Sequence, residues 1–189
     1  MEAVSFLIET KRLGLRQLGP RDRAAIAAML QDPLVMQAWE HAFSEAEVTQ
    51  WIEKRMAEYE LYGNFGYWAM VSKETGQVIG QCGITMQDGG PLGMVPEVGY
   101  MLARAYWHQG YGLEAARAAR DYGFQKLGFP AMYSIIRDNN GPSLHLAERN
   151  GMHPMGRVVK MYRNQAMPHI VCGIRRDEWI QIEKENGRQ

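Results

Sequence analysis

Residues 97–127 read EVGYMLARAYWHQGYGLEAARAARDYGFQKL, and this stretch decides the fold. Val, Tyr, Met and Leu side chains over 97–103 predict a strand. Two glycines one residue apart within 107–112 predict a tight turn, and residues 113–127 predict a helix that Gly128 ends. The sequence therefore predicts a strand that leads through a glycine turn into a helix.

The glycine turn has the features of an anion-binding site. The first N–H groups of a helix have no partner within the helix, and the helix dipole places about half a positive charge there. Gly110 and Gly112 have no Cβ, so a phosphate can approach the backbone closely. We interpret the turn as a pyrophosphate site, with a purely structural strand-to-helix turn as the alternative.

A dinucleotide site is a further alternative, because Gly110-x-Gly112-x-x-Ala115 fits that fingerprint and Asp138 follows the next predicted strand. The order of the preceding segments disfavours it. Consecutive strands with short connections, including a loop over 87–96, form antiparallel hairpins, whereas a dinucleotide fold alternates strands with helices. The predicted strands lie at 66–72, 77–86 and 97–103.

The composition indicates one globular domain over residues 1–189, with a core at about 9–176. The chain is 46% hydrophobic and 22% charged, which is ordinary for a protein with a substantial core. Lys and Arg number 21, as do Asp and Glu, so the formal net charge is zero. This balance removes the simplest electrostatic argument for a nucleic-acid or membrane-surface partner.

The cysteines and histidines argue against a disulfide and against a metal site. Cys82 and Cys172 fall in predicted strands and are expected to be small core residues. The five histidines are scattered and form no zinc-binding spacing with the cysteines. No signal segment or apolar run of about 20 residues is present, so we expect a cytoplasmic location.

The N-terminal part predicts one strand within 6–17, a helix opened by Pro20, and a second helix after Ser44. Ser44 and Glu47 have the spacing of a capping box, and Gly63 is expected to end the second helix.

The large side chains that precede the second helix allow two interpretations. Trp39, Glu40 and His41 stand close together in the sequence, with Trp51 not far behind. Core packing is the first interpretation, and the wall of a substrate site is the second.

The C-terminal part predicts a strand at 131–137 and a short helix capped by Asn140. Residues 154–162 and 166–176 predict a closing hairpin, and 177–185 predict a short amphipathic helix.

At this point the chain resembles the GNAT superfamily of N-acetyltransferases, in particular its RimJ/RimL-type branch of ribosomal-protein N-acetyltransferases. The resemblance spans about residues 9–176. It is carried by TKRLGLR at 10–16, by EVGYML and WHQGYGLEA within 97–115, by Asn140-x-x-Ser143, and by AERNGM at 147–152.

The resemblance implies a mixed α/β (α+β) fold. Its central sheet would have about seven mostly antiparallel strands, flanked by about four helices and splayed at the cofactor strand. It implies acetyl-CoA as cofactor, CoA as product, and no metal. The residues implied to bind the cofactor are Met101, Leu102, Ala103, His108, Gln109, Gly110, Tyr111, Gly112, Leu113 and Asn140.

The implied reaction is attack of a neutral primary amine on the thioester, with Glu97 as the candidate base, acting through a water. The superfamily's usual general-acid tyrosine would fall at Ala147, which leaves the role empty or moves it to Ser143. Trp107 also departs from the usual start of the phosphate loop. A catalytically weak acyl-CoA-binding or sensor protein therefore stays an alternative.

The acceptor is not readable from the sequence. A protein or peptide N-terminus and a small-molecule amine both stay open, and a homodimer would suit the family. We expect the acceptor to lie near Trp39, Glu40, His41 and Tyr162.

Overall fold

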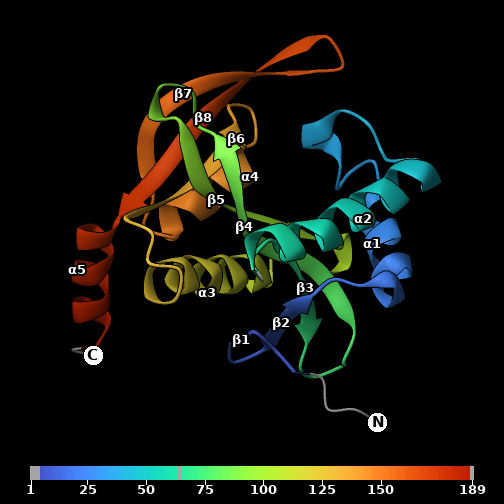
Figure 1. The fold of residues 1–189 in the computed structure, drawn as a ribbon, viewed down its shortest axis with the longest axis horizontal. Helices are drawn as coiled ribbons and strands as arrows, with labels where there is room; N and C mark the ends of the chain where they lie inside the picture. The colour runs from blue at the N-terminus through green and yellow to red at the C-terminus, as the bar shows by residue number, and fades with distance from the viewer. Residues whose placement is uncertain (1–4, 64, 188–189) are drawn as a thin grey trace. The chain divides into compact units, whose positions relative to one another are not determined.

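The computed structural model describes residues 5–63 and 65–187, and the chain divides into two compact units (Figure 1). Unit 1 comprises Met1–Thr85 and Gly99–Ala119, and unit 2 comprises Met86–Val98 and Arg120–Gln189, as far as these are described. Strands β4 and β5 and helix α3 continue from one unit into the other. The expectation of one domain over 1–189 stays a prediction.

The described residues form eight strands and five α-helices. The strands join one sheet in the order β1-β2-β3-β4-β5-β6-β8-β7. They are β1 (Ile8–Glu9), β2 (Leu13–Gln17), β3 (Tyr67–Ser72), β4 (Val78–Asp88), β5 (Met94–Leu102), β6 (Ala131–Arg137), β7 (His153–Tyr162) and β8 (Gln165–Arg175). The helices are α1 (Arg23–Leu30), α2 (Glu45–Tyr62), α3 (Tyr111–Gln125), α4 (Gly141–Arg149) and α5 (Arg176–Asn186).

This architecture confirms the predicted mixed α/β fold with a mostly antiparallel sheet. Strands β2 and β3 pair antiparallel, as do β3 and β4, β6 and β8, and β7 and β8. The β5–β6 pair is parallel, at Glu97 and Tyr133. The strand and helix numbers exceed the expected seven and four, because the 6–17 segment forms a hairpin and the terminal helix is a full element.

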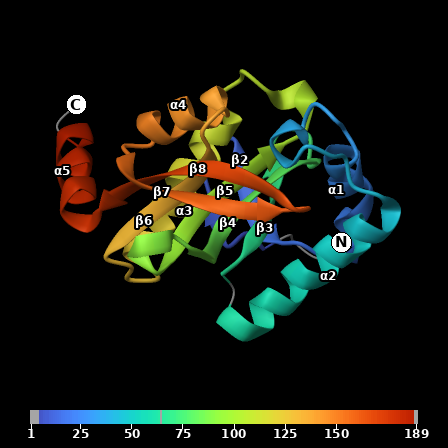
Figure 2. The ribbon, with the colours of Figure 1, turned by 90° about the horizontal axis from the view of Figure 1, so that it is seen from above.

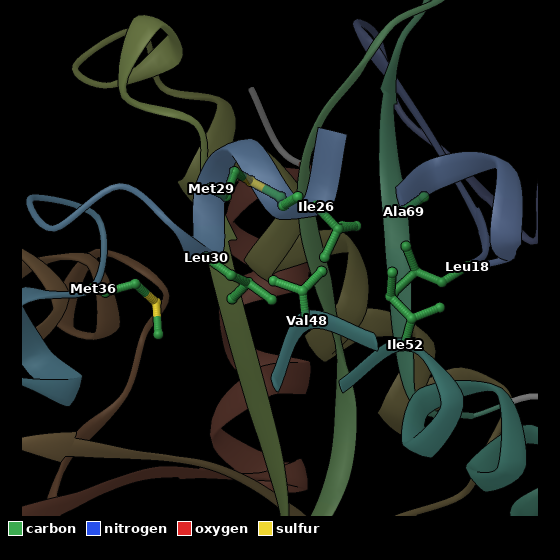
Figure 3. Packing of buried hydrophobic residues seen from close by; sticks show 9 residues of the cluster. Leu18, Ile26, Met29, Leu30, Met36, Val48, Ile52 and Ala69 are labelled. Atoms are coloured by element: carbon green, nitrogen blue, oxygen red, sulfur yellow. The ribbon is translucent and has the colours of Figure 1, made fainter. Parts of the chain in front are cut away.

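In unit 1, helices α1 and α2 share a buried apolar cluster (Figure 3). Leu30 of α1 and Val48 of α2 point toward one another there and are fully buried. The capping box before α2 is confirmed: the Glu47 N–H donates to Ser44 Oγ, and the Ser44 N–H donates to the Glu47 carboxylate at 2.8 Å. Gly63 ends the helix with a left-handed backbone, φ 64°.

In unit 2, the β7–β8 hairpin and β6 lie side by side, and α5 follows directly from β8 (Figures 1 and 2). The ring of Trp179 on α5 stacks on Phe124 with 4.9 Å between centroids. The Trp179 indole N–H also donates to Asp121 at 2.8 Å. These contacts hold α5 against the C-terminal part of α3.

The loop predicted over 87–96 is too long, because the structure confines the connection to residues 89–93. Strand β4 continues to Asp88 and β5 begins at Met94. The connection is short because the Gly89 N–H donates to the Gly93 carbonyl at 2.8 Å, and Gly93 has a positive φ of 70°. Glycine permits this conformation, so both strands extend further than their side chains predict.

Both cysteines are buried free thiols, as expected for core residues. Burial raises the pKa of the Cys82 thiol to about 12, so this thiol is un-ionised at neutral pH. Among the described helices, none has the length together with the apolar character that crossing a bilayer requires.

Asp22, at the entry to α1, should be a major stabilising residue of unit 1. It is 3% exposed, its two carboxylate oxygens each accept from Arg16 at 2.7 Å, and the Gly19 N–H donates to it at 2.9 Å. Removing one partner of a buried ion pair leaves the other charge buried without compensation. Asp22→Ala should therefore lower the free energy of unfolding by about 3 kcal/mol.

Urea denaturation measures this effect, and Glu45→Ala is the matched control. Glu45, the first residue of α2, pairs with Arg23 of α1 at 2.7 Å, but both side chains are exposed. Its removal should change stability little. Equal losses in the two variants would contradict the account.

Candidate functional site

The predicted phosphate turn lies in unit 1, between the end of β5 and the start of α3. Two residues take left-handed backbone conformations there, His108 with φ 58° and Gly110 with φ 81°. Helix α3 begins at Tyr111, two residues earlier than predicted, and Gly112 and Leu113 are buried in its first turn. His108, Gln109 and Gly110 are exposed. The turn therefore presents exposed backbone at a helix N-terminus, which is the arrangement that favours an anion.

Trp107 has a role at this turn that the sequence comparison did not reveal. Its indole N–H donates to the carbonyl of Leu102 at 3.0 Å. The bond ties the start of the turn to the last residue of β5. Trp107 is the residue that departs from the usual loop pattern, and this contact gives it a structural function. A polar-tipped aromatic residue just after a strand is the signal that could have indicated it.

The end of β5 carries the other predicted cofactor residues of unit 1, Met101, Leu102 and Ala103. The Ala103 N–H donates to the Ile79 carbonyl at 3.0 Å, so this residue pairs toward β4. Backbone groups alternate in direction along a strand, so Leu102 directs its N–H and carbonyl toward the opposite edge, where the carbonyl accepts the Trp107 indole N–H. That edge is where an extended ligand could add to the strand.

Glu97 lies in unit 2, in the first half of β5, and its carboxylate replaces a backbone partner. The Ile135 N–H of β6 donates to Glu97 Oε1 at 3.1 Å. The Ser134 hydroxyl donates to the Val98 carbonyl at 2.8 Å. Just beyond the β5–β6 pair at Glu97 and Tyr133, one backbone group of each strand is therefore hydrogen-bonded to a side chain of the other strand.

Burial raises the pKa of the Glu97 carboxyl above its usual value. The positive charge of Lys160 and the Ile135 N–H act in the opposite direction but do not cancel the effect of burial. A carboxyl with a raised pKa is a stronger base than an ordinary glutamate, which suits proton abstraction near neutral pH. The side chain is only partly exposed, so Glu97 is not simply a solvent-facing glutamate at a strand edge.

Asn140 and Ser143 lie together at the start of α4, also in unit 2. Asn140 is the N-cap, and its Oδ1 accepts the Ser143 N–H at 3.3 Å. Capping thus occupies one side of the Asn140 amide. Ala147, the position of the family's usual tyrosine, is 2% exposed within the same helix. A buried methyl group cannot donate a proton.

Trp39 and His41 belong to an aromatic cluster of unit 1, formed by Trp39, His41, Phe43, Trp51 and Tyr67. The Trp39 and Trp51 rings meet edge to face at 5.9 Å. Trp39, Phe43, Trp51 and Tyr67 also pack on the buried cluster of α1 and α2. Packing is therefore a role of this aromatic cluster, and a substrate role for its exposed edges stays a prediction.

The other two predicted acceptor residues lie outside this aromatic cluster. Glu40 is exposed and left-handed, with φ 60°, where it caps the short 3₁₀ turn that ends at Trp39. Tyr162 ends β7 in unit 2, with the Arg163 guanidinium 6.0 Å from its ring centroid. Glu40 stands between Trp39 and His41 in the chain, whereas Tyr162 belongs to unit 2. An acceptor site formed by these four residues stays a prediction.

Two contacts beside the aromatic cluster were not predicted. Gln81 is fully buried in β4 and accepts the Trp51 indole N–H at 3.1 Å. The Tyr67 hydroxyl occupies the space beside Gly99 that a side chain would need. A glutamine inside an otherwise apolar strand run is the signal that could have indicated the first.

Within residues 5–63 and 65–187, no group of three or more His, Cys, Asp or Glu side chains could hold a metal ion.

Comparison with known proteins places these features in a family. Residues 12–153 match the family described as "Acetyltransferase (GNAT) domain". The Bacillus subtilis (strain 168) protein described as "Uncharacterized protein YkkB" is 37% identical over 154 residues, 81% of this chain and 88% of that protein.

Solved structures share the fold. A GNAT-family acetyltransferase from Bacillus anthracis has a TM-score of 0.77 at 21% identity, covering 90% of this chain and 98% of that one. The spermidine N-acetyltransferase from Vibrio cholerae, solved with CoA and spermine, has a TM-score of 0.71 at 18% identity, covering 90% and 99%. The ribosomal-protein-S5-alanine acetyltransferase from Vibrio fischeri has a TM-score of 0.71 at 22% identity, covering 94% and 99%.

The match over 12–153 includes the glycine turn, Glu97 and Asn140, and acetyl-CoA is the cosubstrate of this family. The chain belongs to the GNAT acetyltransferase family and is an N-acetyltransferase enzyme.

Proposed function

We propose that this enzyme transfers the acetyl group of acetyl-CoA to a primary amine by direct attack of the amine on the thioester. The observation that carries the proposal is the exposed glycine turn at the N-terminus of α3, whose backbone suits a pyrophosphate. The acceptor would be a protein or peptide N-terminus or a small-molecule amine. The spermine bound to one structural neighbour and the ribosomal substrate named for another support both classes.

In this proposal, backbone N–H groups of residues 108–113 bind the pyrophosphate of acetyl-CoA. The edge of β5 at 101–103 lies along the pantetheine arm, and Leu102 is the residue there whose backbone faces away from β4, as it would where a peptide adds to a sheet edge. Asn140 contributes a hydrogen bond to the same arm from the free side of its amide. Family membership and the exposed backbone of the turn support this assignment.

Glu97 is the proposed general base, acting on the amine directly or through a water. A lysine amine has an ordinary pKa of about 10.4 and an α-amine of about 7.7–8.0, so most acceptors must lose a proton before they attack. The raised pKa of Glu97 supports this role. The backbone N–H near Leu102 is the proposed oxyanion donor. Ser143 is the proposed hydrogen-bond donor to the leaving thiolate, whose pKa of about 8.5 requires only modest help.

A second candidate function is favoured by one observation, the buried Ala147 where the family's tyrosine usually stands. Without a strong general acid, the protein could bind acyl-CoA and turn it over slowly, as a sensor. Steady-state turnover of acetyl-CoA with a panel of amines separates the two functions, because a sensor would bind acetyl-CoA without transferring its acetyl group at a useful rate.

Ligand-dependent thermal unfolding tests the cofactor site. Acetyl-CoA and CoA at about 100 times their dissociation constants should each stabilise the fold by roughly 2.7 kcal/mol. For a chain of this size the midpoint should rise by about 5–10 °C. NAD is the control and should cause no rise. A rise with NAD alone, or with none of the three ligands, would contradict the proposal.

Glu97→Gln should separate catalysis from stability. Loss of a general base should lower kcat by about a hundredfold or more, while the Kd for CoA stays unchanged. The folded-state pKa of Glu97 lies above its unfolded value, so its ionised form is disfavoured in the fold at neutral pH. A neutral amide avoids that penalty, so the melting temperature of the variant should equal or exceed that of the wild type.

The pH profile gives an independent readout of the same role. Wild-type kcat should rise with pH through the raised pKa of Glu97, because only the carboxylate accepts a proton, and this limb should be absent in Glu97→Gln. Glu185→Gln, at an exposed position on α5, is the matched control. Unchanged kcat in Glu97→Gln at saturating substrate would remove Glu97 from the mechanism.

A further inference from the structure

Arg12, in the turn between β1 and β2, contacts the exposed glycine turn from one side. Its Nε donates to Glu114 Oε2 at 2.6 Å, and its Nη1 donates to the Gln109 carbonyl at 2.9 Å. The guanidinium carbon also lies 4.1 Å from the centroid of the Tyr111 ring. One side chain thus contacts three residues of the turn and of the first turn of α3.

Glu114 holds Arg12 in this position. Its Oε1 accepts the Thr10 hydroxyl at 2.6 Å and the Arg12 N–H at 2.9 Å, while Oε2 accepts Arg12 Nε. Burial acts to raise the pKa of the Glu114 carboxyl, but the Thr10 and Arg12 hydrogen bonds and the Arg12 charge outweigh it and lower that pKa. Glu114 is therefore ionised at neutral pH. Its own N–H donates to the Gly110 carbonyl at 3.1 Å, which joins this anchor to the glycine turn.

The bond from Arg12 to the Gln109 carbonyl fixes the direction of a backbone N–H. The Gln109 carbonyl and the Gly110 N–H belong to one planar trans peptide, so they point in opposite directions. With the carbonyl held by the guanidinium, the Gly110 N–H is directed away from Arg12. A cationic donor on the carbonyl also polarises the peptide and makes its N–H a stronger donor.

We propose that Arg12, held by Glu114, is a positioning residue that presets the glycine turn for the pyrophosphate of acetyl-CoA. This inference rests on the proposed function of that turn. It also gives a role to the opening TKRLGLR segment, about a hundred residues away in sequence: its Thr10 contacts Glu114 of α3, and its Arg12 contacts the turn itself. Preorganised donors bind an anion without having to be ordered at the moment of binding.

The test compares Arg12→Gln, Glu114→Gln and the double variant. Losing a charge-assisted hydrogen bond that sets the turn should raise the KM for acetyl-CoA and the Kd for CoA about tenfold or more, with a much smaller change in kcat. Because the two residues act as one unit, the double variant should bind CoA no more weakly than the worse single variant. Arg12→Lys keeps the charge without the planar fork and should recover only part of the affinity.

Activity with S-acetylpantetheine as the acetyl donor distinguishes a positioning role from a general loss of structure, because a general loss would lower this activity too. This donor lacks the pyrophosphate and the nucleoside, so its kcat/KM should be the same in the wild type and in all Arg12 and Glu114 variants. Glu9→Gln is the matched control, because Glu9 pairs with Lys73 at 2.8 Å beside the same β1–β2 turn without touching residues 108–114. Its KM for acetyl-CoA should stay at the wild-type value.

Three results would overturn the inference. Wild-type CoA affinity in Arg12→Gln would show that the turn needs no positioning. Weak binding in Arg12→Gln with full affinity in Glu114→Gln would indicate direct contact of Arg12 with the ligand instead. An equal loss with S-acetylpantetheine would indicate a general structural role. A wild-type protein that binds no CoA is a different result, because it removes the proposed function itself and the inference with it.

Discussion

A strand that leaves its neighbour in a sheet must satisfy its backbone hydrogen bonds by other means, and this constraint governs the site. In β5 and β6 the change comes just beyond the pair at Glu97 and Tyr133. The Ile135 N–H is taken by the Glu97 carboxylate, and the Val98 carbonyl is taken by the Ser134 hydroxyl. Side chains therefore satisfy these two backbone groups, which would otherwise need other partners.

The same constraint explains why the residues after β5 are so closely tied. The Trp107 indole takes the Leu102 carbonyl at the start of the turn, and Arg12 takes the Gln109 carbonyl further on. Exposed turns are usually the less ordered parts of a fold, and two carbonyls held by side chains restrict the conformations open to this one. Glu97, in contrast, is a destabilising feature, because burial of an acidic group disfavours its ionised form. A destabilising feature of this kind is typical of a site shaped for chemistry.

Local patterns in the sequence predicted most of the secondary structure. The Ser44–Glu47 capping box, the Gly63 helix end, the Asn140 cap and the strand at 131–137 all lie where they were expected, because each depends on residues within a few positions. The start of β5 was missed because it depends on a backbone bond between Gly89 and Gly93, which no side chain indicates. The Arg12–Glu114 pair was missed because its partners are 102 residues apart and meet only in the fold.

The central claim is that the glycine turn, preset by Arg12, receives the pyrophosphate of acetyl-CoA. A crystal structure of the CoA complex tests it most directly. The account predicts pyrophosphate oxygens within hydrogen-bond distance of backbone N–H groups of residues 108–113, the Gly110 N–H among them, with Arg12 still bound to the Gln109 carbonyl on the opposite side. A pyrophosphate bound elsewhere on the protein, or a turn whose Gln109 carbonyl has left Arg12, would contradict it.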